Sequence, residues 1–316
     1  MKRVLLLFLR IFITIAIFFA LFKFVPYSAI IEIYRDSHKI YLLIGFLVFI
    51  ASHFIGVYRW RFLLSSLGLV VSFREAFYAF FCGLFFNLFF PSLIAGDVFR
   101  GFSISCRHGQ TGKVASSVLM DRFSGAVAMA LVALISLLIG INILGEGQII
   151  AAVLMLCAII GFIFLIIFNK AVFLFTIRVL RQTSRLRERL VKFHDQLYFF
   201  KSNPHIFIKS LIFSASIQIL SPIAFFIISK AFMVEVNIVY FLILVPIIAA
   251  ISLIPVTIAG AGTREASAVY FFSLIGVQKG IGLGMSLVNL IFLIFSGIIG
   301  GIIYVAVYHR WLQPRP

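Results

Sequence analysis

An all-α polytopic membrane fold is predicted for this chain of 316 residues by three observations: its composition, its hydrophobic segments, and a ten-residue pattern that occurs twice. Hydrophobic residues make up 63% of the chain, charged residues make up 12%, and the mean hydropathy is +1.18. A soluble domain with this composition would expose large apolar patches. The chain divides into about eight hydrophobic segments. We predict that they form six full spans and two re-entrant hairpins in an inverted repeat.

The repeated pattern is P-x-x-I-A-G-x-x-x-R, and neither copy contains a gap. The first copy occupies residues 91–100 and the second occupies residues 255–264. Both copies follow an apolar run, and their offset of 164 residues is close to half the chain. Interrupted helices at corresponding positions of two halves are typical of inverted-repeat membrane proteins, whose substrate site lies between the halves. We therefore predict one transmembrane domain, 1–316, with half repeats at about 1–147 and 148–316.

The first half is predicted to contain two spans, one re-entrant hairpin and one further span. The segment 96–112, which begins at the glycine of the first copy, contains Asp97, Arg100 and Arg107, so it is too polar for a full span. We expect the chain to enter the membrane, turn at the pattern and leave by the same side. Residues 58–61, which end the second span, are interpreted as an anchor at the cytoplasmic interface. The predicted elements are a span at 4–25, a polar connection at 26–39, a span at 40–57, a hairpin of 76–90 with 96–112, and a span at 114–139.

The second half is predicted to repeat this order in the opposite orientation. The predicted elements are a span at 149–168, a span at 206–228, a hairpin of 238–253 with 264–277, and a span at 281–308. The loop 140–148 contains Glu146 and no Lys or Arg, so we expect it outside the cell. Arg310 and Arg315 follow the last span, and we expect both termini on the cytoplasmic side of the inner cell membrane.

The main alternative is that all eight segments cross the membrane, which would also leave both termini in the cytoplasm. A basic block decides between the two arrangements. Between Lys170 and Lys209, nine Lys and Arg residues are opposed only by Glu188 and Asp195. Apolar residues recur in this block every three to four positions, which predicts a cytoplasmic amphipathic basic segment at 170–205 on anionic inner-leaflet lipids. This block lies on the same side of the membrane as the turn after the second span only if the first hairpin does not cross the membrane. We therefore favour the arrangement with two hairpins.

The two copies of the pattern are the candidate substrate site. A Pro and a Gly interrupt each helix, and the half-helix that follows has free amide groups that favour an anion. Arg100 and Arg264 lie about one turn into these half-helices and are predicted to contact a phosphate group. The hairpin turns are assigned to Pro91, Gly96, Pro255, Gly260 and Gly262.

Four acidic or basic neighbours and one amide complete the predicted site. Asp97 and Glu265 are predicted to orient the two arginines or to pair with a cationic headgroup. Asp121 and Arg122 are predicted to line the substrate path, because charges inside a span usually face a cavity or a partner. Asn87 is added as a polar group in the apolar run before the first turn. The alternative is that the charged pairs only hold the hairpins together.

Several classes of site are not indicated by the sequence. Neither a catalytic constellation nor a metal-binding motif is found, and no cofactor is expected. Cys82, Cys106 and Cys157 are not at a metal-ligand spacing. The net charge of +17 is interpreted as reporting topology and anionic lipid, not nucleic acid. We expect a transporter and not an enzyme.

Three stretches, 87–100, 118–125 and 254–265, resemble the flippase-like family, which is the transmembrane region of lysylphosphatidylglycerol synthase. The resemblance covers essentially the whole chain, and the three motifs occur in order. It implies translocation of a lipid between leaflets. In the best-known members this region moves an aminoacylated phospholipid outward, and a separate soluble domain makes that lipid. The first motif of the family usually has a second glycine where this chain has Ala95.

The chain ends at Pro316, just after the last predicted span, so we expect a stand-alone member without the soluble domain. We carry over the translocation role and not the phosphatidylglycerol lysyltransferase role that the family label suggests. The expected partners are a phospholipid or polyprenyl-phosphate-linked lipid, a separate synthase or glycosyltransferase, and a second copy of the chain.

Two rival functions are compatible with the sequence. The first is a non-catalytic membrane subunit that presents a lipid-linked substrate to a separate glycosyltransferase or aminoacyltransferase, with the basic helix Lys170 to Lys201 as the surface on which that enzyme docks. The second is an integral membrane transferase, which would need a base and an acceptor site that the sequence does not show.

Overall fold

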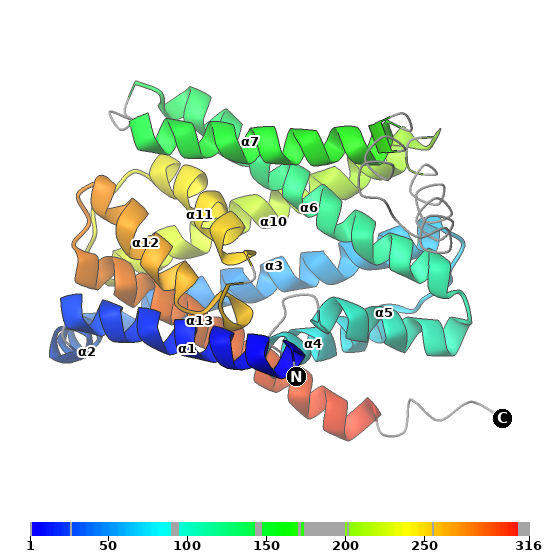
Figure 1. The fold of residues 1–316 in the computed structure, drawn as a ribbon, viewed down its shortest axis with the longest axis horizontal. Helices are drawn as coiled ribbons and strands as arrows, with labels where there is room; N and C mark the ends of the chain where they lie inside the picture. The colour runs from blue at the N-terminus through cyan, green and yellow to red at the C-terminus, as the bar shows by residue number, and fades with distance from the viewer. Residues whose placement is uncertain are drawn as a thin grey trace.

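The computed structural model describes residues 2–25, 27–89, 95–142, 147–169, 172–173, 200, 202–254 and 256–308. These residues are almost entirely helical and contain no strand, which confirms the predicted fold class. Figure 1 shows most of the helices running side by side, with α7 at one edge of the view and α1 at the opposite edge. The helices of the first half are α1 (Lys2–Phe24), α2 (Tyr27–Asp36), α3 (Lys39–Ser66), α4 (Phe73–Phe89), α5 (Ala95–His108) and α6 (Thr111–Gly140). Those of the second half are α7 (Gly147–Phe168), α10 (Pro204–Ala231), α11 (Ile238–Ser252), α12 (Thr263–Leu274) and α13 (Lys279–Ile303).

Five of the described helices are long and apolar enough to cross a membrane: α3, α6, α7, α10 and α13. Helix α11 and residues Phe12–Lys23 of α1 are shorter apolar helices. The chain is therefore a multi-pass membrane protein. The count of six full spans and the re-entrance of the hairpins stay predictions.

The first copy of the pattern joins two antiparallel helices, α4 and α5. Phe86 and Phe99, near the turn, stack with ring centroids 4.1 Å apart. Glu75 and Arg107, at the far ends of the same helices, approach to 3.5 Å. Because early residues of α4 meet late residues of α5, the chain reverses direction between the two helices. The predicted turn residue Pro91 lies outside the described residues.

The second copy joins α11 and α12 in the same antiparallel way. The rings of Phe241 and Phe272 lie 5.4 Å apart, and the backbone of Gly260 returns to that of Ser252. A short 3₁₀ turn, Ile258–Gly260, lies between the two helices. Gly260 and Gly262 have φ angles of 72° and 90°, a region that favours glycine, so both fit their predicted place in the turn. Pro255 lies outside the described residues.

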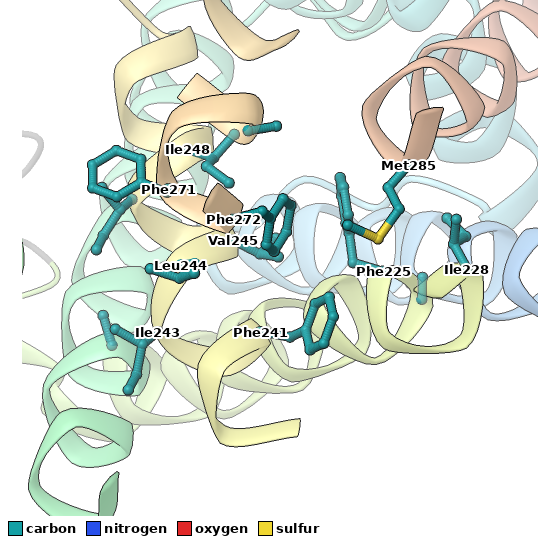
Figure 2. Packing of buried hydrophobic residues seen from close by; sticks show 14 of the residues in the cluster. Phe225, Ile228, Phe241, Ile243, Leu244, Val245, Ile248, Phe271, Phe272 and Met285 are labelled. Atoms are coloured by element: carbon teal, nitrogen blue, oxygen red, sulfur yellow. The ribbon is translucent and has the colours of Figure 1, made fainter. Parts of the chain in front are cut away.

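Each hairpin packs against a long helix of the other half. Helix α4 packs on α13, and α11 packs on α6, while α3 and α10 pack together near the middle of the molecule. The largest buried apolar cluster joins α10, α11, α12 and α13, and Figure 2 shows Phe225, Phe241, Phe272 and Met285 meeting there. Since lipid is as apolar as these side chains, close packing holds such a cluster together.

Two predicted boundaries differ from the structure. The connection 26–39, for which only a short polar link between spans was predicted, contains the helix α2. Tyr34 of α2 packs against Phe232, and its hydroxyl donates a hydrogen bond to the Gly284 carbonyl oxygen (3.4 Å). This burial raises the pKa of Tyr34 to about 12. The short helix forms because one of its faces has partners on the helices that follow.

The second difference is the length of α3, which continues to Ser66 although its span was predicted to end at Val57. Trp60 is therefore fully buried and the side chain of Arg59 is only 11% exposed, so the interpretation of residues 58–61 as an interfacial anchor was wrong for these two. Most of the predicted basic segment 170–205 lies outside the described residues, so its amphipathic helix stays a prediction.

Candidate functional site

Five charged side chains form a continuous row across α3, α5 and α6. Arg59 Nε donates to Asp121 Oδ1 (2.6 Å), and an Arg100 terminal nitrogen donates to Asp121 Oδ2 (2.8 Å). Arg100 Nε lies 3.1 Å from Asp97 Oδ1. Arg122 donates to both oxygens of Asp97, at 2.6 and 2.9 Å. Basic and acidic groups thus alternate along the row, and each carboxylate lies between two guanidinium groups.

Burial differs along the row. The side chains of Asp121 and Arg100 are 3% and 4% exposed, whereas that of Arg122 is 48% exposed. Arg100 also lies over the rings of Trp60 and Phe80, at 4.8 and 5.6 Å from their centroids, as a cation–π contact requires. With three arginines and two aspartates, the row carries one positive charge in excess.

A hydroxyl network extends the row to α10. A terminal nitrogen of Arg59 donates to Ser214 Oγ (2.8 Å), and Ser214 Oγ lies 3.1 Å from Ser124 Oγ. Ser210 Oγ donates to the same Ser124 oxygen at 2.9 Å. All three serines are buried. The network fixes Arg59 from the side opposite to Asp121.

Asn87, one of the predicted site residues, has a structural contact. Its Oδ1 accepts a hydrogen bond from the backbone N–H of Gly96 (2.8 Å), which belongs to the first turn of α5. The first amides of a helix have no partner within the helix, so Asn87 satisfies one of them. This contact holds the turn of the first hairpin closed.

Two cavities meet at the row. A polar cavity of about 200 Å³ is lined by His53, Arg59, Phe80, Gly83, Leu84, Asn87, Gly96, Asp97, Arg100, Asp121 and Arg122. A larger cavity of about 640 Å³, within the size range of ligand pockets, is mainly apolar. It is lined by Asp97, Val98, Gly101, Phe102, Ser105, Thr111, Ala115, Val118, Leu119, Arg122 and Leu253. Asp97 and Arg122 line both cavities, and Leu253 comes from the end of α11.

The second hairpin places its charged residues differently. A terminal nitrogen of Arg264 donates to the carbonyl oxygen of Ala259 (3.1 Å), while its other terminal nitrogen is buried without a hydrogen-bond partner in the described chain. Glu265 is fully buried and accepts from the Gly262 backbone N–H (2.6 Å) and from Ser286 Oγ (3.3 Å). Arg264 lines neither of the two cavities. Its predicted contact with a phosphate stays a prediction.

We predict that Glu265→Ala will lower the free energy of unfolding by about 1–2 kcal/mol, because the first turn of α12 loses its cap. Glu265→Gln should cost less, since its amide oxygen can still accept from the Gly262 amide. The measurement is denaturant unfolding in detergent, with Glu235→Ala, an exposed residue, as the matched control. Equal stability of Glu265→Ala and the control would contradict a capping role.

Of the predicted site residues, the structure joins Asp97, Arg100, Asp121 and Arg122 in one row, and it places Asn87 beside them. It separates Arg264 and Glu265 from this row. Sequence reasoning missed Arg59 and the serines of α10 as parts of the site. One signal was present for Arg59: the apolar residues 62–64 follow it, so the helix does not need to end there.

Comparison with known protein families finds a match over most of the chain. A family model described as the lysylphosphatidylglycerol synthase TM region matches residues 7–301 of the chain. These residues include α3 to α6 and the whole of the charged row. No curated protein matches the chain.

Proposed function

The chain belongs to the family of the lysylphosphatidylglycerol synthase transmembrane region, a membrane region related to lipid handling, and from this premise we propose that it moves a phosphate-bearing lipid between the two leaflets of the bilayer. The single observation that carries the proposal is the excess positive charge of the row beside a large apolar cavity. A phospholipid or a polyprenyl-phosphate-linked lipid has both features that such a site would match, a negative headgroup and an apolar chain.

The charge balance supports a ligand with a negative group. Charged side chains inside a membrane are costly, and their cost falls when every charge has a counter-charge. Asp97 and Asp121 compensate two of the three arginines, so the third lacks a full counter-charge among the lining residues. One phosphate would complete the balance.

The cavities support a ligand with an apolar part. Val98, Phe102, Val118 and Leu119 give the larger cavity its apolar wall, and its polar residues Asp97 and Arg122 also face the polar cavity. Both parts of one lipid would be buried if its headgroup lay at the arginines and its apolar chain lay in the larger cavity. The apolar chain of the lipid meets surroundings of similar polarity in the bilayer and in the cavity. Binding is therefore decided by the charged headgroup.

The packing of the hairpins supports a route through the middle of the membrane. Each hairpin packs against a long helix of the other half, as two inverted repeats would do around a shared site. We infer half repeats at about 1–147 and 148–316, re-entrant hairpins, and termini on the cytoplasmic side of the cell membrane. Arg264 would contact the headgroup in a second state of the cycle.

The proposal predicts that the reconstituted protein will accelerate exchange of fluorescent phosphatidylglycerol between the leaflets of phosphatidylcholine vesicles. A membrane-impermeant quencher added outside measures the fraction of label that becomes accessible with time. Arg100→Gln should reduce the rate to that of empty vesicles, because it removes a cation of the row. Arg100→Lys should keep part of the rate.

Two controls separate transport from leakage and from unfolding. Vesicles with trapped soluble dye test leakage, and the melting temperature of each variant tests folding. Lys230→Gln is the matched control, because it also removes one positive charge but lies in the last turn of α10 and lines neither cavity. A wild-type rate equal to that of empty vesicles would overturn the proposal.

A further inference from the structure

The pair formed by Asp97 and Arg122 lies between the two cavities. Among the residues that the structure describes, only these two line both the polar cavity and the apolar cavity. They are held together by two hydrogen bonds, at 2.6 and 2.9 Å. A ligand with its headgroup in one cavity and its chain in the other would therefore lie across this pair.

Arg122 differs from the other two arginines in how firmly it is held. Arg100 contacts two carboxylates and two aromatic rings, and Arg59 contacts Asp121 and Ser214 from opposite sides. Within the described residues, the hydrogen bonds of Arg122 go to Asp97 alone, and its side chain is 48% exposed. It is the most exposed of the three cations of the row, since the side chains of Arg59 and Arg100 are 11% and 4% exposed.

The row also contains a buried group without a hydrogen-bond partner in the described chain, Arg100 Nε. It lies 3.1 Å from Asp97 Oδ1, within ion-pair distance but without hydrogen-bond geometry. Both oxygens of Asp97 are meanwhile oriented toward Arg122. If Arg122 moved away, the carboxylate could turn and accept the Arg100 Nε–H, so Asp97 would not become an unpaired buried charge.

These observations lead to one inference, which rests on the proposed function and deepens it. We propose that Arg122 exchanges Asp97 for the phosphate of the lipid, and that this exchange joins the two cavities into one binding site. Arg59 and Arg100 stay fixed and hold the hairpin to α3 and α6. Arg122 is thus the specificity-determining contact, and Asp97 competes with the ligand for it.

Competition makes a prediction that a purely structural pair does not make. Asp97→Asn removes the competitor, so it should tighten binding of phosphatidylglycerol by roughly threefold or more, because Arg122 is free in a larger fraction of molecules. Arg122→Gln should weaken binding by about tenfold, since a charge-assisted contact to phosphate is lost. The double variant should bind like Arg122→Gln, because the competitor has nothing left to compete for.

Trp60 supplies a readout for the binding measurement. The chain has two tryptophans, and Trp311→Phe leaves Trp60, which lies under the guanidinium of Arg100, as the single emitter. Its fluorescence is titrated in detergent with short-chain phosphatidylglycerol, and with diacylglycerol of the same chains as the phosphate-free probe. Asp36→Asn is the control for charge alone: it makes the same chemical change at an exposed carboxylate at the end of α2 and frees no contact of Arg122, so it should not tighten binding.

The outcomes separate this inference from the proposed function. Weaker binding in both Asp97→Asn and Arg122→Gln, with unchanged melting temperatures, would mean that the pair is structural and would overturn the exchange. Unchanged affinity in Arg122→Gln, while the wild-type protein still prefers the phospholipid to diacylglycerol, would overturn the role of Arg122 and leave the proposed function standing. Equal affinity of the wild-type protein for both probes would overturn the proposed function itself.

Discussion

Replacing Asp121 by Asn will lower the free energy of unfolding by roughly 3–5 kcal/mol, because breaking a buried ion pair leaves an uncompensated buried charge. Asp121 is the carboxylate between Arg59 and Arg100, and its side chain is 3% exposed. The substitution leaves Arg59 without its carboxylate partner and leaves Arg100 with Asp97 as its only carboxylate contact among the described residues. It also cuts the connection between α3, α5 and α6.

Denaturant or thermal unfolding in detergent measures this loss. Asp36→Asn is the matched control, because Asp36 is an exposed carboxylate at the end of α2 and the same atoms change. Asp121→Glu should recover part of the stability, since it keeps the charge but displaces it by one methylene group. If Asp121→Asn were as stable as the control, the row would not hold these helices together.

The long helices were predictable from the sequence because membrane helices are defined by long apolar runs, which are local features. The pairing of Asp97 with Arg100 was also predictable, since residues three apart in a helix are neighbours. The pattern that occurs twice located both turns between antiparallel helices. These features need no knowledge of how distant segments pack.

The rest of the site depends on contacts between distant residues. Arg59 and Asp121 are 62 residues apart, and a sequence does not show that α3 and α6 turn these two side chains toward each other. Interfacial Arg and Trp are common anchors, so the buried pair Arg59 and Trp60 was assigned to the membrane surface. Glu265 was expected near the substrate because it follows Arg264, whereas its oxygens accept from Gly262 and Ser286.

Gly96→Ala tests the role of the glycine in the first copy of the pattern. A Cβ atom at position 96 would lie 2.0 Å from the carbonyl oxygen of Gly83 and 2.7 Å from the Asn87 side chain. Backbone atoms cannot move aside as a flexible side chain can, so α4 and α5 must separate. We expect a loss at or above the upper end of the roughly 1–3 kcal/mol that overpacking usually costs.

Gly101→Ala on the same helix is the matched control. A Cβ atom there would lie 3.6 Å from Val118, an ordinary contact, so its unfolding free energy should be nearly unchanged. Separation of α4 and α5 in Gly96→Ala should also disturb Arg100, whose side chain lies between Phe80 of α4 and Asp121 of α6. The fluorescence of Trp60 and the rate of lipid exchange should therefore change together with stability.

Equal melting temperatures for Gly96→Ala and Gly101→Ala would mean that the helices of the hairpin can part without cost, and the row would not depend on their close approach. A loss in Gly96→Ala alone would give the repeated glycine a physical reason. The close contact of α4 and α5 sets the position of Asp97 and Arg100, and this position brings the row beside the apolar cavity. A motif recognised by spacing would then act on lipid through the packing of two helices, and not through a contact of the glycine with the ligand.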